Sequence, residues 1–150
     1  MGRGLSELQK AILELAWAEY ERHHNASKDK ELVARWQQWD HDNFKRYLLP
    51  DDEKPIPPAE FVPFIEDNWM GYAWIADIFV RYYHWTPRSI TRRGQSKFSK
   101  SEIGTKPYMA AYIAVRKALT RLQDRKLISI SGDITSYALT MAGQDLMAKL

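Results

Sequence analysis

The sequence predicts a single domain that is mostly α-helical and carries a small β-ribbon, an α+β fold. Apolar residues recur at helical spacing in several long segments, most clearly over 111–122. A β-branched run over 127–131 precedes a Gly-Asp turn and a second strand-like run. The chain has 150 residues, 45% of them hydrophobic and none of them Cys, so it is long enough to bury one core without disulfides.

The N-terminal segment predicts an amphipathic helix. Ser6 and Gln9 have the spacing of a capping box, in which each side chain bonds the backbone N–H of the other residue. Apolar residues then recur every three or four positions. We therefore expect a helix over 6–22, ended by the polar stretch 23–27.

Residues 23–68 are interpreted as an insertion within the domain. Apolar residues lie roughly on one stripe of 28–49, so a second helix is expected there, and Pro50 ends it. Five prolines from 50 to 63 predict an irregular, semi-rigid connection.

The centre of the chain predicts a third helix and an exposed basic loop. Asp67 or Asn68 is expected to cap a helix over 69–84, which the Thr-Pro pair at 86–87 ends. The segment 86–98 contains four Lys or Arg and no acid, which is typical of an exposed loop.

Two further helices are expected after this loop. Ser99 and Glu102 form a second capping box, but Gly104 limits that helix to a single turn. Thr105 is expected to cap a long helix over 106–126, whose first turn contains a proline, where the missing N–H costs nothing.

The C-terminal segment predicts the ribbon and a closing helix. The strands are expected over 127–131 and 134–139, joined by a tight turn at Gly132 and Asp133. Thr140 is expected to cap a last helix that continues to the C-terminus.

Charge is segregated along the chain. From Arg81 to Lys126 there are twelve Lys or Arg and two acids, a net charge of +10. From Glu19 to Asp67 there are seven basic and twelve acidic residues, a net charge of −5. Dense positive charge on one stretch is typical of a protein with a polyanion partner, although a solvated helix face explains it equally well when taken alone.

No pattern argues for catalysis, a cofactor or a metal ion. The chain has no Gly-rich phosphate loop and no nucleophile–base motif. His23 and His24 are adjacent, so their side chains rarely reach one ion, and a solvated helix end explains them better. The longest aromatic and apolar run, 69–85, contains charges and is too short to span a membrane, so we expect a cytoplasmic protein with no membrane partner.

Three stretches resemble the winged helix-turn-helix DNA-binding family. Residues 118–128 (ALTRLQDRKLI) look like the end of a recognition helix and the start of the first wing strand. Residues 139–146 (LTMAGQDL) look like the Leu-Thr-x-x-Gly-x-x-Leu closure after the wing, and residues 4–13 are similar to first helices of uncharacterised prokaryotic members. Residues 23–68 match nothing in that family, and the resemblance covers about two-thirds of the chain.

In that family the recognition helix lies in the major groove and the wing contacts the DNA backbone or minor groove. The resemblance implies that the start of the 106–126 helix reads bases and that the 88–100 basic segment anchors the backbone. The implied DNA-binding residues are Arg88, Arg92, Arg93, Lys97, Lys100, Lys106, Tyr108, Tyr112, Arg116, Lys117 and Arg121. The implied wing consists of Ser131, Gly132, Asp133 and Thr135.

Several alternatives stay open at this point. Tyr108 and Tyr112 either contact DNA or cover the basic loop as part of the core, and the structural role is favoured slightly for Tyr112. Trp36 and Trp39 either complete the core or form a homodimer seam, and the dimer is the working hypothesis because winged-helix regulators often dimerise through added helices. The gap from Pro87 to the long helix exceeds the three or four residues of a standard helix-turn-helix, and the wing contains no Lys or Arg.

The expected function is therefore duplex DNA binding, as a transcriptional regulator or as a replication or partition accessory. The main rival is a winged-helix module whose basic face binds an acidic protein, which the wing without cations favours. A third possibility is structured RNA, because aromatic rings beside cations suit stacking on unpaired bases.

Overall fold

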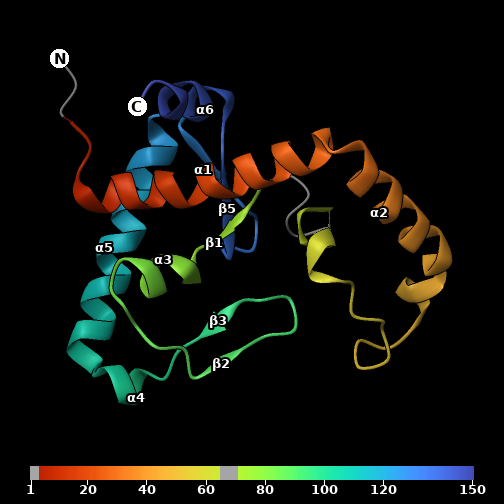
Figure 1. Ribbon diagram of the computed structural model, residues 1–150. Helices are drawn as coiled ribbons and strands as arrows, with labels where there is room; N and C mark the ends of the chain where they lie inside the picture. The colour runs from red at the N-terminus through yellow and green to blue at the C-terminus, as the bar shows by residue number, and fades with distance from the viewer. Residues whose placement is uncertain (1–3, 65–70) are drawn as a thin grey trace.

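The computed structural model describes residues 4–64 and 71–150. It is mostly helical, with a three-stranded antiparallel sheet and a separate two-stranded hairpin, so the expected α+β class is confirmed. Figure 1 shows the long first helix crossing the body and leading into a second helix that points away from it. The elements are α1 (Glu7–Lys28), α2 (Lys30–Asp42), the 3-10 helices η1 (Phe44–Leu48) and η2 (Ala59–Phe64), β1 (Ala73–Trp74), α3 (Ala76–Arg81), β2 (Ser89–Ile90), β3 (Ser96–Lys97), α4 (Lys100–Ile103), α5 (Thr105–Asp124), β4 (Ile128–Ile130), β5 (Ser136–Leu139) and α6 (Met141–Ala148).

The core of the body lies between α1, α5 and the sheet. The apolar stripe expected on the long helix is buried at every position: Ala111, Val115, Ala118, Leu119 and Leu122. It packs against Ile12 and Leu13 of α1, which are fully buried because their side chains share one face of that helix. From the sheet, the buried Tyr137 hydroxyl donates a hydrogen bond of 2.7 Å to the carbonyl oxygen of Ile12.

The sheet has the strand order β1–β5–β4. The ribbon β4–β5 is present as expected, with Ile128 opposite Leu139. The strand β1 was not expected, because residues 73–74 lie inside the helix predicted over 69–84, and they pair with β5 instead. That prediction is wrong where it can be compared: α3 covers only 76–81, and the capping positions 67–68 lie outside the described residues. A run of aromatic and apolar residues fits both the helical and the strand period, so its sequence does not distinguish the two. Residues 73–74 form a strand because the free edge of β5 is available to pair with them.

The prediction that 23–27 ends the first helix is also wrong. The helix α1 continues to Lys28, since this stretch contains neither Gly nor Pro and Ala26 is buried in the arm. Asp29 then ends α1 and begins α2, where its carboxylate accepts from the backbone N–H groups of residues 31 and 32. The helix expected over 28–49 is therefore shorter, and it is followed after Asn43 by the separate 3-10 turn η1.

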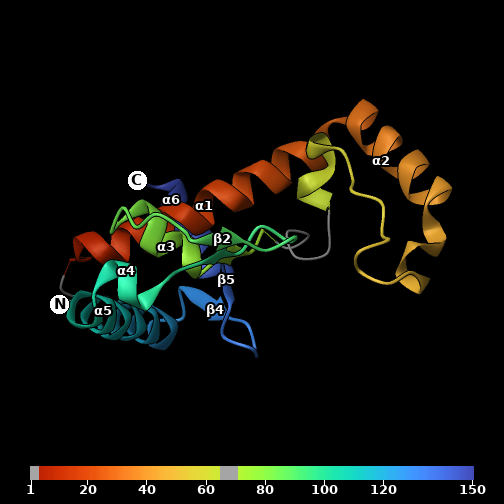
Figure 2. The ribbon, with the colours of Figure 1, turned by 90° about the horizontal axis from the view of Figure 1, so that it is seen from below.

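The insertion forms an arm with its own small core, and Figure 2 shows it projecting from the body. We use the term arm for α2, η1, the acidic connection after it and η2. Ala26, Phe61 and Phe64 are buried in this cluster, and Trp36 and Trp39 pack against them. The arm therefore covers part of its own apolar surface without a second chain.

The basic loop predicted over 86–98 is a β-hairpin. Its strands β2 and β3 pair Ser89 with Lys97, and the turn is closed by Thr91, which accepts from the backbone of Gln95 at 3.0 Å. Gly94 in this turn has φ of 96°, a conformation that favours glycine. Strands of two polar residues carry no alternating apolar pattern, so nothing in the local sequence indicates them.

The predicted helix caps agree with the structure in three of four cases. The capping box of Ser6 and Gln9 is complete, Ser99 caps the single turn α4, and Thr140 accepts from the backbone of Gly143. The exception is α5, which begins at Thr105 with Gly104 as its N-cap, and which ends at residue 124 rather than 126. None of the helices within 4–64 and 71–150 is both long and apolar enough to cross a membrane.

Candidate nucleic-acid interface

Most cations of the basic half of the chain are not neutralised by nearby acids. Ion pairs among the described residues lie in the N-terminal half, at Glu7–Lys10, Glu19–Arg22, Arg35–Glu60, Asp40–Arg46 and Asp51–Lys54. Leaving Arg93 aside, no Lys or Arg from 81 to 126 forms an ion pair with a described residue. Their positive field therefore reaches the solvent, which is the condition for attracting a polyanion.

The exposed face of α5 gathers three of the predicted DNA-binding residues. Arg116, Lys117 and Arg121 line a shallow groove of about 360 Å³ together with Ile113 and Thr120. The groove lies on the side of the helix opposite the buried stripe, because its residues follow one another at spacings of three or four, as Ile113, Arg116 and Thr120 and as Lys117 and Arg121. The groove thus combines cations with the exposed apolar side chain of Ile113.

The two predicted tyrosine contacts belong to a cluster of packed rings. Tyr108 stacks on Trp85 at a ring distance of 5.5 Å, and Tyr112 stacks on Phe79 at 4.6 Å. Tyr108 and Tyr112 are themselves 4.7 Å apart. This cluster joins the start of α5 to the end of α3, so both tyrosines have a structural role whatever else they contact.

The electrostatic state of Tyr112 follows from this packing. Burial, and then a hydrogen bond with Tyr108, raises the pKa of the Tyr112 hydroxyl to about 12. The side chain is nevertheless 40% exposed at its outer edge. A hydrogen bond that raises the pKa of a phenol stabilises its protonated form, so the Tyr112 hydroxyl donates its proton to Tyr108 and keeps its oxygen as an acceptor.

Four predicted cations lie near the base of the hairpin and the start of α5. The backbone N–H of Arg88 donates to the carbonyl of Lys97 at 2.7 Å, so both belong to the same end of the hairpin. Lys100 lies over the ring of Tyr108, 5.8 Å from its centre, and Lys106 is exposed in the first turn of α5. These residues can act with the α5 groove as one basic surface.

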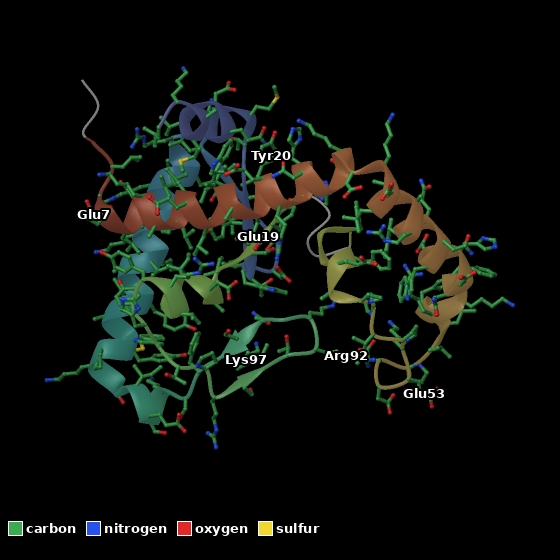
Figure 3. All side chains as sticks on the ribbon, viewed as in Figure 1. Glu7, Glu19, Tyr20, Glu53, Arg92 and Lys97 are labelled. Carbon is green, nitrogen blue, oxygen red and sulfur yellow. The ribbon has the colours of Figure 1, made fainter. Side chains whose placement is uncertain are left out.

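The tip of the hairpin is directed elsewhere, toward the arm. Arg92 donates a hydrogen bond to the carbonyl oxygen of Lys54, and Figure 3 shows Arg92 at the hairpin turn, on the side of Glu53. We call Asp51, Asp52 and Glu53 the acidic loop. The pKa of Asp51 is lowered mainly by the hydrogen bond and charge of Lys54, and further by Arg92 and its neighbour at 93. The structure thus separates the hairpin tip from the α5 groove.

The predicted wing uses its polar groups internally. Asp133 accepts from the hydroxyls of Ser131 at 2.7 Å and Thr135 at 2.8 Å, and these bonds lower its pKa. At the same tip, Ile134 is 59% exposed and has φ of 59°. The carboxylate stays ionised at neutral pH, so this turn presents a negative charge and an apolar side chain rather than cations.

The two tryptophans predicted at a dimer seam lie in the core of the arm. Trp36 stacks on Trp39 at 5.7 Å and on Phe64 at 5.7 Å, and the guanidinium of Arg46 lies 5.0 Å from the Trp39 ring centre. Sequence reasoning missed the neighbouring exposed patch on η1 and the Pro-rich connection. That patch consists of Phe44, Tyr47, Leu48, Leu49 and Ile56. The signal that could have found it is the apolar run 47–49 before Pro50.

No protein-family model, curated protein or solved structure matches the chain. Within 4–64 and 71–150, no group of three or more His, Asp or Glu side chains converges in a way that could hold a metal ion.

Proposed function

We propose that this protein is a winged helix-turn-helix protein that binds duplex DNA with the exposed face of α5. The elements α1, α3, α5, β4–β5 and α6 follow one another as helix, helix, helix, two-stranded ribbon and helix, an order that is compatible with this family. The small sheet and the buried stripe of α5 support this assignment, because they leave the other face of α5 free for the major groove. The role that fits is a transcriptional regulator or a replication or partition accessory.

The observation that carries the proposal is the groove of Arg116, Lys117 and Arg121, whose cations form no ion pair with any residue of 4–64 and 71–150. Each cation that neutralises a phosphate releases a condensed counterion, which makes binding favourable and dependent on salt. Arginine also has two parallel donors that suit the major-groove edge of guanine. We therefore assign base reading to Arg116 and phosphate contacts to Lys117 and Arg121.

Backbone anchoring is assigned to the cations at the hairpin base and the start of α5. Lys97, Lys100 and Lys106 are exposed and lie at one end of α5. Arg92 bonds to the arm, so its contribution requires the hairpin tip to leave the acidic loop. The predicted wing makes at most a minor contact, because Asp133 would repel phosphates.

The proposal is tested by fluorescence anisotropy with random duplex DNA over a salt series. The test variant is Arg116→Ala with Arg121→Ala, and its matched control is Lys28→Ala with Lys30→Ala, which removes two exposed cations at the start of the arm. If both arginines contact phosphates, the slope of log K against log salt falls by about 2, and by about 1 if only one does. No duplex binding at low salt, or an equal loss in the control, would remove the proposal.

A second candidate is a module that binds an acidic protein segment on the same face. Ile113 and Met109 are exposed on α5 beside the cations, and the wing adds no positive charge. An apolar side chain within a basic groove suits an amphipathic acidic peptide. Failure of duplex DNA to bind, with matched single-stranded DNA and RNA also failing, would favour this candidate.

We also propose a homodimer, whose interface would lie further along the arm than Trp36 and Trp39. Trp36 and Trp39 already pack within the arm, whereas Tyr47, Leu48 and Ile56 are strongly exposed close to them in sequence. A second copy would cover these apolar side chains. Sedimentation velocity over a wide dilution range tests this, and monomer at every concentration would exclude it.

A further inference from the structure

A pocket of about 290 Å³ lies between α3, the hairpin, the first half of α5 and the turn between β4 and β5. In Figure 1, α3 lies between α1 and the hairpin, next to α5. The side chains that matter for its chemistry are Phe79, Lys97, Phe98, Tyr108, Tyr112 and Ile134. This volume is at the lower end of the range for ligand sites, so it suits a small molecule.

One part of the pocket wall is aromatic. Phe79 stacks on Tyr112 at 4.6 Å, and Phe98 meets Phe79 edge to face at 6.0 Å. These contacts hold the rings in fixed orientations. Rings fixed in this way offer a preformed stacking surface to another planar ring. The hydroxyl groups of Tyr108 and Tyr112 add polar atoms to the aromatic part of the wall. The polar residues that also line the pocket are Gln95, Ser96 and Thr135.

The pocket is lined by a positive charge. Among the described residues that line it, Lys97 alone carries a charge, and its ammonium has no acid within ion-pair distance in the described chain. Because the Tyr112 hydroxyl donates to Tyr108, the proton of the Tyr108 hydroxyl is the one left for a ligand. A carboxylate is the complement of a Lys ammonium and a phenol hydroxyl.

The turn that closes one side of the pocket is strained. Ile134 has φ of 59°, in the left-handed region that β-branched residues rarely adopt, yet its side chain lines the pocket rather than the core. Strain of this kind persists where the surrounding structure holds it, and it is frequent at ligand sites. Ile134 thus adds an exposed apolar residue to the edge of the pocket.

We propose that this pocket binds a small aromatic acid, with its ring against the tyrosines and Ile134 and its carboxylate toward Lys97. Such a ligand would touch α3, the hairpin and α5 at once, and would hold the hairpin base against the start of α5. Under the proposed function, these two elements contact DNA, so the ligand would change DNA affinity. This last step rests on the proposed function, whereas binding of the acid does not.

The test is a titration of the protein with benzoate, followed by amide chemical shifts in ¹H–¹⁵N spectra without DNA. We expect saturable shifts of amides in the hairpin, α3 and the start of α5. Benzamide keeps the ring without the charge, and cyclohexanecarboxylate keeps the charge without the flat ring. Both should bind at least about tenfold more weakly than benzoate if ring stacking and the charge both contribute.

The variants separate the pocket from general charge effects. Lys97→Met should weaken benzoate binding about tenfold, and Ala76→Leu should abolish it by filling the pocket. Lys149→Met is the matched control, because Lys149 is an exposed cation after α6 and does not line the pocket, so the affinity of this variant for benzoate should equal that of wild type. The dispersion of each spectrum shows whether the variant is folded.

Three results would overturn the proposal: no saturable shifts at millimolar benzoate, equal affinity for all three compounds, or equal losses in the Lys97 and Lys149 variants. The comparison of compounds uses wild-type protein and stands even if a variant fails to fold. DNA binding is measured separately by anisotropy with and without benzoate. Benzoate binding without any DNA binding would remove the proposed function and leave the pocket assignment intact.

Discussion

Gly143, near the start of α6, packs against the backbone just before β4, so the added methyl group of a Gly143→Ala variant tests this contact. A Cβ at this position would lie 2.1 Å from the carbonyl oxygen of Leu127 and 3.1 Å from a methyl group of Leu139. Contacts of real Cβ atoms are essentially never under 3.0 Å, so the Gly143→Ala variant must move α6 and β4 apart by about 0.9 Å. The obstacle is backbone, so a rotamer change cannot relieve it.

The cost follows from what this movement disturbs. The backbone N–H of Thr140 donates to the same Leu127 oxygen at 3.0 Å, and its hydroxyl donates to the carbonyl of Lys126 at 2.5 Å. Overpacking of this kind costs about 1–3 kcal/mol, and one weakened hydrogen bond about 1 kcal/mol more. The higher helix propensity of alanine stabilises the folded variant by about 1 kcal/mol relative to glycine. We expect a net loss of about 2–3 kcal/mol in the free energy of unfolding, at the upper end because backbone must move.

The assay is urea denaturation followed by circular dichroism, with the midpoint expected to fall by about 1 M at an unchanged slope. Gly132→Ala is the matched control, since no atom lies within 4 Å of its added Cβ and its φ is not positive, so it should stay within about 0.5 kcal/mol of wild type. A Gly143→Ala variant as stable as the control would show that α6 does not dock on the start of β4 as described.

Three other perturbations have defined outcomes. Tyr137→Phe should lower the free energy of unfolding by about 1 kcal/mol in the same urea assay, because the buried hydroxyl loses its bond to Ile12 while the ring stays packed. Asp77→Asn should raise the thermal midpoint at pH 7 more than at pH 3. Burial and then Glu19 raise the pKa of Asp77, so its carboxyl group opposes folding increasingly as pH rises above its ordinary pKa of 3.8. Equal gains at both pH values would contradict this. Changing the acidic loop to amides should raise duplex affinity several-fold at low salt and less at high salt, because the negative charge of Asp51 near Arg92 and that of its two neighbours are removed. Anisotropy that showed no gain would exclude competition between the loop and DNA.

Features that depend on residues three or four positions apart were predictable. The capping box of Ser6 and Gln9 and the cap of Thr140 need only the local chain, so the sequence pattern is sufficient. The same holds for the buried stripe of α5, because a helix of 20 residues repeats its apolar positions often enough to define one face. The ribbon was predictable because its turn residues lie between two β-branched runs.

Features that depend on a partner far along the chain were missed. The strand β1 exists because β5 offers an edge to Ala73 and Trp74, about sixty residues away. The hairpin β2–β3 is closed by a hydrogen-bonded turn, whereas the composition of this segment indicates only that it is polar. The stretch 23–27 is compatible with either a helix or its end, and burial of Ala26 in the arm decides for the helix. Short elements have too few residues to carry a period, so tertiary contacts decide them.

The sequence by itself determined the fold class, the segregation of charge and the identity of the cations available to a polyanion. Only the tertiary structure decided which of those cations lie together: Arg116 and Arg121 share a groove, whereas Arg92 bonds to Lys54 beside the acidic loop, 38 residues earlier in the chain. It also decided that Tyr112 stacks on Phe79 and lines a pocket instead of standing free on the helix. Charge and helical period are properties of the local chain, but a pocket or a competing contact requires segments that only folding brings within a few ångströms of each other.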